Sequence, residues 1–318
     1  MAASLRPIGD KMAEKVLVTG AAGYIGGSIA SLLVKSGYQV KGLTRSKEKA
    51  DELESRGIEP VIGELTDSNL LAKCAAEADI VVDAADSDSA TAVTTFTDAL
   101  AGSNKVFIHT SGSSIVSDRA NGERSERVFT EDTKYTPDPD KQARVDIDNQ
   151  VLAAAKKGIR SVVICPCMIY GEGLGVNSES QQVPALIEQA IKSGTVRCIG
   201  RGQNVWSTIH IQDLADLYLT VIQNAPQGGM FLFAESGEVS FKDLVEKIRT
   251  SLSIKNPVEE WPIEKAIEAW GFGRAVFALG SNSRIRGERG KKMGWKPTRE
   301  SVLDDVQRCC SHFVALVK

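Results

Sequence analysis

Three glycines near the start of the chain carry the clearest chemical signal. The segment VLVTGAAGYIGG sets them in a G-x-x-G-x-x-G pattern between a strand-like and a helix-like apolar run. The first glycine permits a sharp turn, the second lets backbone amides approach a pyrophosphate, and the third lets the helix pack closely on the strand. The helix N-terminus adds unpaired N–H groups for the anion. We predict a dinucleotide-binding turn at Gly20, Gly23, Tyr24, Ile25 and Gly26; the alternative is a turn needed only for packing.

The second predicted strand ends in KGLTRS, where a bound dinucleotide would place its adenosine ribose. An acidic residue at this tip accepts hydrogen bonds from the 2′-hydroxyl of NAD, whereas an arginine suits a 2′-phosphate. Arg45, with Lys47 and Lys49 nearby, therefore favours NADP (NADPH) over NAD as the cofactor. The alternative is that Arg45 is only a solvated charge beside the adenine.

Strands and helices alternate through the first half of the chain. Short apolar runs predict strands at Lys15–Thr19, Tyr38–Thr44, Pro60–Ile62, Asp79–Asp83, Lys105–Thr110 and Arg160–Cys165. Helices are expected between them over Tyr24–Ser36, Lys47–Ser55, Asp67–Ala78, Ser89–Ala101 and Asp140–Lys157. This order is typical of parallel βαβ units and predicts an α/β fold, a Rossmann-type doubly wound parallel sheet.

The alternation changes beyond about residue 172, where short strands mix with helices. We predict an NAD(P)-binding Rossmann domain over residues 1–171 and a smaller C-terminal α/β substrate-binding lobe over 172–318. The segment 196–219 is expected to return to the first domain. Two polar stretches, 117–139 and 173–182, are expected to form a lid over the substrate.

Composition excludes several classes of protein. The 38 basic and 41 acidic residues give a net charge of −3 with no basic block, which argues against nucleic-acid binding. Six cysteines without a CxxC pair and three dispersed histidines predict no metal site. The uncharged run 16–34 contains four glycines and follows two acidic residues, so we predict neither a membrane span nor a signal peptide. A reduced, cytoplasmic protein is expected.

Six segments of the chain match sequence motifs of one family, in the order in which that family has them. They are TGAAGYIG, GELTD at 63–67, VVDAAD at 81–86, FIHTSG at 107–112, ICPCMIYGEG at 164–173 and WSTIHIQDLADLY at 206–218. Together they resemble the extended and atypical branches of the short-chain dehydrogenase/reductase superfamily, the NAD(P)-dependent epimerase/dehydratase group. The resemblance runs from residue 15 to about 300. It implies a nicotinamide cofactor, a small-molecule substrate and a homodimer formed through the helices near 89–101 and 140–157.

The resemblance also implies which residues border the cofactor, namely Asp67, Ala84, Ala85, Ser111, Pro166 and Met168. Asp67 would hold the adenine amino group, the two alanines would line the adenosine and pyrophosphate, and the other three would border the nicotinamide. The alternatives are an N-cap for Asp67 and tight packing for the alanines. His210 and Asp213 resemble a structural pair of the family.

The chain departs from this family where catalysis is concerned. The family uses a Tyr-x-x-x-Lys pair, in which the tyrosine is the general acid/base and the lysine lowers its pKa and binds the nicotinamide ribose. None of the five tyrosines here has a lysine four residues later. The alignment puts Asp140 at the tyrosine, Arg144 at the lysine, and Gly112, between Ser111 and Ser113, at the usual serine.

We therefore predict Ser111, Ser113, Tyr135 and Arg144 as the catalytic candidates. Arg144 could hold ribose hydroxyls but cannot act as an acid near neutral pH. Asp140 could donate a proton only if burial raised its pKa by several units. Tyr135 could fold back from its loop as the acid, or be an exposed loop residue, and Ser113 could orient the substrate.

Three functions remain open at this point. The first is an NADP-dependent oxidoreductase acting on a carbonyl, enone or imine without the tyrosine acid, since the cofactor itself performs hydride transfer. The second is an isomerase, dehydratase or retro-aldolase on the same fold. The third is a non-catalytic regulator that senses the NADP redox state.

Overall fold

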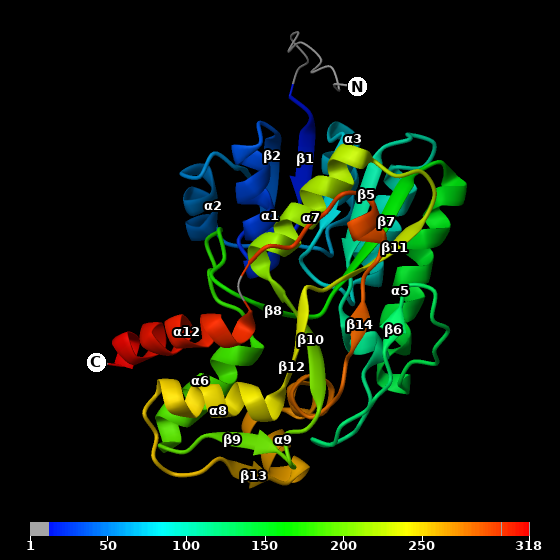
Figure 1. Ribbon diagram of the computed structural model, residues 1–318. Helices are drawn as coiled ribbons and strands as arrows, with labels where there is room; N and C mark the ends of the chain where they lie inside the picture. Colours follow the sequence, from blue (N-terminus) through cyan, green and yellow to red (C-terminus); the bar gives the residue numbers. More distant parts are fainter. Residues whose placement is uncertain (1–12, 300, 318) are drawn as a thin grey trace, which may run out of the picture.

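Seven strands form the central sheet of the computed structural model, which describes residues 13–299 and 301–317 (Figure 1). They are β1 (Lys15–Val18), β2 (Gln39–Thr44), β3 (Glu59–Ile62), β4 (Ile80–Asp83), β5 (Val106–Thr110), β7 (Arg160–Pro166) and β11 (Met230–Ala234). Their spatial order is β11, β7, β5, β4, β1, β2 and β3, and every pairing is parallel. The predicted doubly wound α/β fold is confirmed.

Helices cover both faces of this sheet. They are α1 (Tyr24–Lys35), α2 (Lys47–Glu54), α3 (Ser68–Glu77), α4 (Ala90–Ala99), α5 (Gln142–Ala153) and α7 (Ile211–Asn224). The pleat of β1 separates two cores: Val16 and Val18 pack with α1, α2 and α7, whereas Leu17 packs with α3, α4 and α5. Because both faces are buried, most side chains of the central strands are apolar, with Asp83 and His109 as buried polar residues in β4 and β5.

The C-terminal lobe lies beyond the carboxyl ends of these strands (Figure 1). One small sheet orders β12 (Gly237–Ser240), β10 (Val205–His210) and β8 (Met168–Tyr170), and a second pairs β9 (Arg197–Ile199) with β13 (Glu259–Trp261). The helices here are α6 (Gln182–Ser193), α8 (Phe241–Ser251), α9 (Ile263–Trp270), α10 (Phe272–Arg274), the π-helical η4 (Ala275–Leu279) and α12 (Val302–Val317). The apolar faces of α6, α8, α9, η4 and α12 share one core. The short helix α11 (Arg289–Lys292) packs instead on β11 of the large sheet and on α7.

The chain passes between the two parts more often than the sequence predicted. Met230–Ala234, assigned to the lobe, is β11 of the large sheet and pairs with β7. Of the expected returning segment 196–219, α7 packs on α1, whereas β9 and β10 belong to lobe sheets. A short apolar strand has the same sequence pattern in either sheet, so periodicity could not decide its partner.

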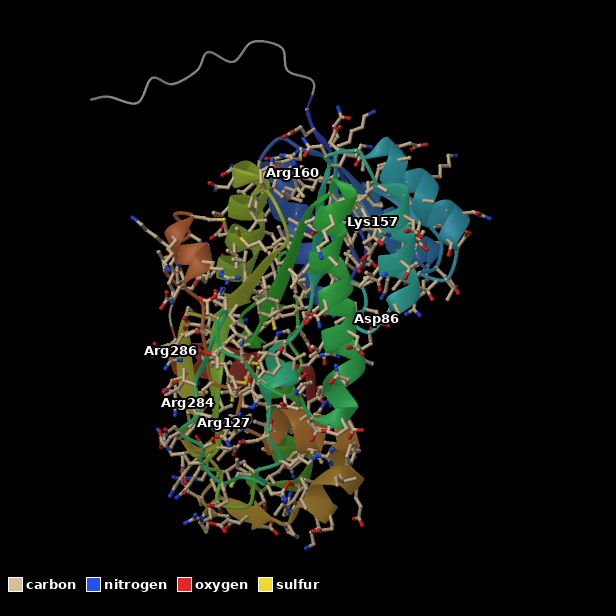
Figure 2. The ribbon with its side chains drawn as sticks, turned by 90° about the vertical axis from the view of Figure 1, so that its right-hand side faces the viewer. Asp86, Arg127, Lys157, Arg160, Arg284 and Arg286 are labelled. Carbon is tan, nitrogen blue, oxygen red and sulfur yellow. The ribbon has the colours of Figure 1, made fainter. Side chains whose placement is uncertain are left out.

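Three short helical turns and one further strand pair complete the connections. The turns are η1 (Ser113–Val116), η2 (Pro139–Lys141) and η3 (Ala154–Lys157); the pair is β6 (Phe129–Thr130) with β14 (Ile285–Arg286). This pair ties the long loop 117–139 to the C-terminal segment. Figure 2 shows Lys157 and Arg160 at the end of the sheet far from the lobe, and Asp86 at the end that faces it.

The predicted exclusions can be compared with the described residues. No helix among them is long and apolar enough to cross a membrane, and the uncharged run 16–34 is a strand, a turn and a helix. Within 13–299 and 301–317 no three histidine, cysteine or acidic side chains gather as metal ligands do. The six cysteines are free thiols, five of them buried.

Candidate active site

A cleft runs along the carboxyl ends of the strands, between the large sheet and the lobe. It consists of one cavity of about 800 Å³ against the lobe and a second of about 760 Å³ beside β2 and β3. Both are lined by Gly20, Gly23, Ala85 and Asn177, so they meet at the glycine-rich turn. The predicted turn is therefore the centre of the cleft.

The turn depends on its glycines. Gly20 has a φ of +66°, and a Cβ there would lie 2.8 Å from the Cα of Ala85. A Cβ on Gly26 would lie 2.4 Å from the carbonyl oxygen of Gly20. Helix α1 starts at Tyr24 after Gly23, which caps it without a side-chain hydrogen bond, so the first amides of α1 are free for an anion.

Thr19 connects the turn to the end of β4. Its hydroxyl donates to Asp83 Oδ1 (2.7 Å) and accepts from the backbone amides of Ala84 (3.0 Å) and Ala85 (3.2 Å). Both alanines line the large cavity. Thr19 and Asp83 were not singled out from the sequence, because a buried strand gives no indication of polar pairing with its neighbour.

Buried polar groups continue from Asp83 across the sheet to the cavity wall. Asp83 Oδ2 lies 2.9 Å from His109 Nδ1, and the hydroxyl of Ser111 donates to Asp148 Oδ2 (2.7 Å). His109 Nε2 and Asp148 Oδ1, 3.9 Å apart, are buried without a hydrogen-bond partner among the described residues. Burial raises the pKa of Asp148 to about 6, against the opposing effects of Ser111, His109 and Arg144.

Asp148 should therefore make folding stability depend on pH. A carboxyl whose pKa is raised on folding stabilises the protein below its unfolded pKa and loses that contribution as the pH rises through 6. A rise of the Asp148 pKa from 3.8 to about 6 corresponds to about 3 kcal/mol. Asp148→Asn keeps an acceptor for Ser111 but cannot ionise. We therefore expect the unfolding free energy of this variant, relative to that of the unmodified protein, to increase by about 3 kcal/mol from pH 4 to pH 8. Urea unfolding at several pH values measures the difference.

Asp146→Asn is the matched control, because Asp146 is exposed on the same helix. Its difference from the unmodified protein should stay constant with pH. A constant difference for Asp148→Asn as well would show that burial does not perturb this carboxyl.

The smaller cavity has basic and hydroxyl side chains at its rim. Thr44, Arg45, Ser46 and Lys49 line it, and Arg45 is exposed and makes no hydrogen bond or ion pair with the described residues. Asp67 is not among the lining residues. Its carboxylate accepts a hydrogen bond from the amide of Leu70 (3.0 Å) and caps the N-terminus of α3. This capping role is the alternative expected for Asp67 from the sequence. The preceding residues 63–66 line the cavity in its place.

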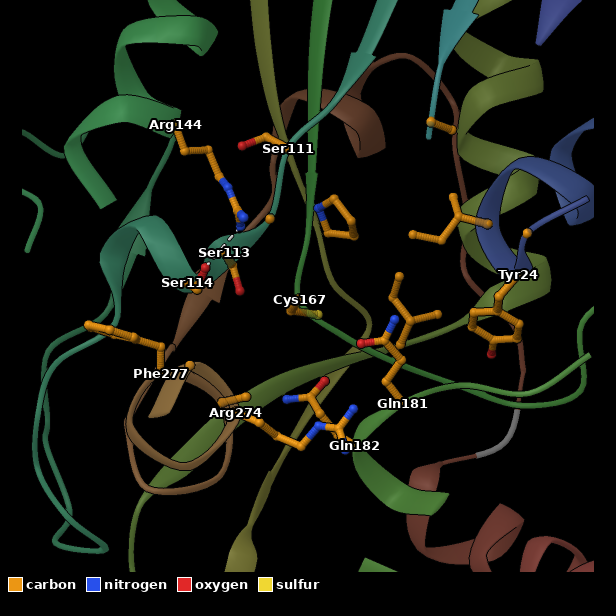
Figure 3. Close-up of a pocket in the computed structure, with 18 of the residues that line it drawn as sticks. Tyr24, Ser111, Ser113, Ser114, Arg144, Cys167, Gln181, Gln182, Arg274 and Phe277 are labelled. Atoms are coloured by element: carbon orange, nitrogen blue, oxygen red, sulfur yellow. Dashed lines mark hydrogen bonds between the residues drawn. The ribbon is translucent and has the colours of Figure 1, made fainter. Parts of the chain in front are cut away.

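Arg144 lies on the wall of the large cavity and is held firmly. Its guanidinium donates to both carboxylate oxygens of Asp88 (2.8 and 2.6 Å) and to the hydroxyl of Ser114 (3.1 Å; Figure 3). Ser111 and Pro166 line the same cavity.

Met168 does not line it. The side chain of Met168 is fully buried in the core of the lobe, and its neighbours Cys167 and Ile169 face the cavity. The alternation of β8 therefore turns the predicted residue away and exposes the residues on either side.

The remaining catalytic candidates are less favourably placed. The hydroxyl of Ser113 lines the cavity but lies 2.8 Å from that of Ser283. Tyr135 lies outside this cavity, packs edge-on against Phe129, and borders a separate small pocket. Burial raises the pKa of Tyr135. Asp140 is exposed and paired with Arg119 (2.8 Å), so burial does not prepare it to donate a proton.

The lobe contributes residues that the sequence did not single out. Trp206, Trp270 and Phe277 line the large cavity together with Arg274, which extends from α10 into the space between the walls (Figure 3). Lys141, beside the position aligned with the family tyrosine, lines it as well. That adjacency was the one available signal, because the lobe residues are distant in sequence.

The segment after β8 closes the cleft from the side of α1. The hydroxyl of Tyr24 donates to the carbonyl of Gly171 (2.8 Å), and the amide of Leu174 donates to Ser28 (3.0 Å). Gln181 and Gln182, within the predicted lid 173–182, line the cavity. The predicted lid loop 117–139 does not contribute a lining residue to this cavity.

His210 and Asp213 have structural contacts. His210 caps α7 by accepting from the amide of Gln212 (3.2 Å). Asp213 is buried and accepts from the amides of Thr298 and Arg299 (3.1 Å each). The pair therefore attaches the C-terminal segment to α7.

Comparison with known proteins shows to which family the chain belongs. The model of the NAD-dependent epimerase/dehydratase family matches residues 16–233. The oxidase ucsJ of an Acremonium species is 29% identical, with 93% of this chain and 96% of that protein covered. A 4-hydroxy-2-methyl-3-oxo-4-farnesyl-3,4-dihydroquinoline-1-oxide ketoreductase of Stigmatella aurantiaca is 24% identical over 83% and 80% of the two chains.

Solved structures agree on the fold. The dTDP-glucose 4,6-dehydratase of Bacillus anthracis, solved in complex with NAD, superposes with a TM-score of 0.74 at 19% identity, with 95% of this chain and 97% of that chain covered. The family match, the parallel sheet and the glycine-rich turn at its centre lead to the same conclusion: this chain belongs to the NAD-dependent epimerase/dehydratase family.

Proposed function

We propose that the protein is an NADPH-dependent reductase of a small organic substrate carrying a carbonyl, enone or imine. The observation that carries this proposal is the cleft of two cavities that meet at the glycine-rich turn. One cavity suits an adenosine half, and the other has room for a nicotinamide and a substrate. The oxidase and ketoreductase names of two relatives support redox chemistry for this chain.

The cleft residues fit a nicotinamide dinucleotide phosphate from end to end. Arg45 and Lys49 make no ion pair with the described residues and suit a 2′-phosphate, and the first amides of α1 suit the pyrophosphate. Arg144, fixed by Asp88, would hold the nicotinamide ribose, and Ser111 would border the ring. When bound, NADPH supplies a hydride to the substrate.

The substrate would lie against the lobe. Trp206, Trp270 and Phe277 offer apolar and aromatic surface there, and Arg274 makes no ion pair with the described residues. An unsaturated or aromatic substrate with an anionic or carbonyl oxygen suits this combination. Tyr24 is the one tyrosine on the wall of this cavity, and its hydroxyl donates to Gly171 rather than to the open space. Catalysis therefore proceeds without the tyrosine acid of the family.

The proposal can be tested with purified protein and a panel of enones, imines and aldehydes. We expect at least one of them to be consumed in step with NADPH oxidation, measured by absorbance. No turnover of any compound would contradict the proposal. Unequal affinities for NADPH and NADP⁺ would then favour a redox-sensing regulator, and equal affinities would exclude that as well.

We further propose a cytoplasmic homodimer. The buried free thiols favour a reducing compartment. Helices α4 and α5 lie together on one side of the sheet, joined by Gln150 to Thr94 (2.9 Å) and by η3 through Lys157 to Asp98 (2.8 Å). A second copy could pack on this pair of helices, and sedimentation of the purified protein tests it.

A further inference from the structure

We propose that Lys141 is the general acid of this site and gives its Nζ proton to the heteroatom of the substrate during reduction. The inference rests on the proposed reductase function and names the group that replaces the missing tyrosine. It follows from the position of Lys141, from the partners of the charged groups around it, and from the state of the other proton donors in the cavity.

Lys141 is placed at the wall by the way α5 begins. It is the last residue of η2 and the N-cap of α5, and its amide donates to the carbonyl of Asp138 (2.8 Å). This turn directs Asp140 outward to Arg119 and leaves Lys141 on the cavity. The family tyrosine position and the new donor are thus one residue apart.

The carboxylates near Lys141 are all engaged by arginines. The guanidinium of Arg119 donates hydrogen bonds to the carboxylates of Asp138 (2.6 and 2.8 Å) and Asp140 (2.8 Å). That of Arg144 donates to the carboxylate of Asp88 (2.8 and 2.6 Å). The Nζ of Lys141 has no hydrogen bond or ion pair within the described part of the chain. It lies 4.3 Å from the centre of the Phe277 ring, which is itself a wall of the cavity.

The other acidic groups on the wall are not available. Tyr24 donates its hydroxyl proton to Gly171 (2.8 Å), and Cys167 donates its thiol proton to Ala234 (3.2 Å). Burial raises the pKa of both groups well above the usual range. Glu179 is hydrogen-bonded to His312 (3.2 Å), and the two lining arginines, Arg144 and Arg274, do not give up protons near neutral pH.

The pKa of Lys141 is shifted in the opposite direction to the pKa values of Tyr24 and Cys167. Burial, followed by the positive charge of Arg144, lowers the pKa of Lys141. The charged groups that face it are Asp88, Arg119, Asp138, Asp140, Arg144 and, across the cavity, Arg274. A lowered pKa makes the ammonium a better proton donor.

In the proposed step NADPH is the reductant and Lys141 supplies the proton. A hydride adds to the carbonyl or imine carbon (the β carbon of an enone), and the π electron pair moves to the oxygen or nitrogen. That atom takes the proton from Lys141 as the N–H bond breaks, which leaves a neutral amine. Solvent at the mouth of the cavity then returns the proton to the amine.

Lys141→Arg separates proton donation from charge. Arginine keeps the positive charge beside Phe277 but cannot act as the acid. We expect kcat to fall at least 100-fold in Lys141→Arg and in Lys141→Met, with the affinity for NADPH, measured by fluorescence titration, unchanged. Lys156→Met, an exposed lysine in η3 after the same helix, should leave kcat unchanged.

The pH profile identifies the group. In the unmodified protein kcat should fall as the pH rises through the pKa of Lys141, below that of an ordinary lysine, and this fall should be missing from both Lys141 variants. ¹³C-methyl labelling of the lysines should give one NMR resonance that titrates early and disappears in Lys141→Arg. Full kcat in Lys141→Arg, or an unchanged pH profile, would overturn the assignment and leave the reductase proposal intact. Absence of turnover in the unmodified protein would overturn both.

Discussion

Gly26→Ala should abolish tight cofactor binding. The new methyl group would lie 2.4 Å from the carbonyl oxygen of Gly20, a backbone atom that cannot move without displacing the turn. Such overpacking costs on the order of 1–3 kcal/mol of stability. Loss of one or two amide bonds to a phosphate weakens binding by roughly 100-fold. NADPH fluorescence titration measures the affinity, and urea unfolding measures the stability.

Gly237→Ala is the control for the chemical change itself. Gly237 is exposed in β12, and its Cβ would meet only the Thr208 hydroxyl at 3.3 Å. It should bind NADPH as the unmodified protein does. Tight binding by a folded Gly26→Ala protein would mean that the turn is not the phosphate site.

The second large effect is expected at Arg45. Because this guanidinium has no partner among the described residues and lines the smaller cavity, a 2′-phosphate bound there would gain a charge-assisted hydrogen bond from it. We expect Arg45→Ala to weaken NADPH binding by roughly 10- to 100-fold and to leave NADH binding unchanged, so that the preference is lost. Titration of NADPH and NADH against the unmodified protein and the variant measures these affinities.

Lys47→Ala supplies the matched control, since Lys47 carries a similar charge two residues later but does not line the cavity. It should keep the preference for NADPH. Equal affinities for NADPH and NADH in the unmodified protein would refute the role of Arg45.

Much of this architecture follows from local sequence. The glycine spacing, the apolar runs and the strand–helix alternation predicted the turn, all five strands of the large sheet that precede residue 160, and the doubly wound sheet. These features depend on neighbours in sequence, and backbone sterics and hydrophobic periodicity act at that range. β7 at 160–166 was predicted on the same basis.

The residues that the sequence missed depend on contacts across the fold. His109 and Asp148 are 39 positions apart and meet because α5 packs on β7, the neighbour of β5. Trp206 and Phe277 line one cavity because β10 and η4 come together in the folded lobe. Met168 and Asp67 were assigned by resemblance, but a strand's phase and a helix cap turned them away from the cleft. Lys141 faces the cavity because η2 precedes α5, and this geometry is not evident from the residue types.

In the reaction that we propose, NADPH delivers a hydride to a substrate bound beside the lobe. The most direct measurement uses NADPH carrying deuterium at C4 with a turned-over member of the substrate panel, followed by mass spectrometry and NMR of the product. We expect one deuterium per NADPH oxidised, on the former carbonyl or imine carbon or on the β carbon of an enone, from one face of C4. Product without deuterium, or NADPH bound but never oxidised by any of these compounds, would contradict it.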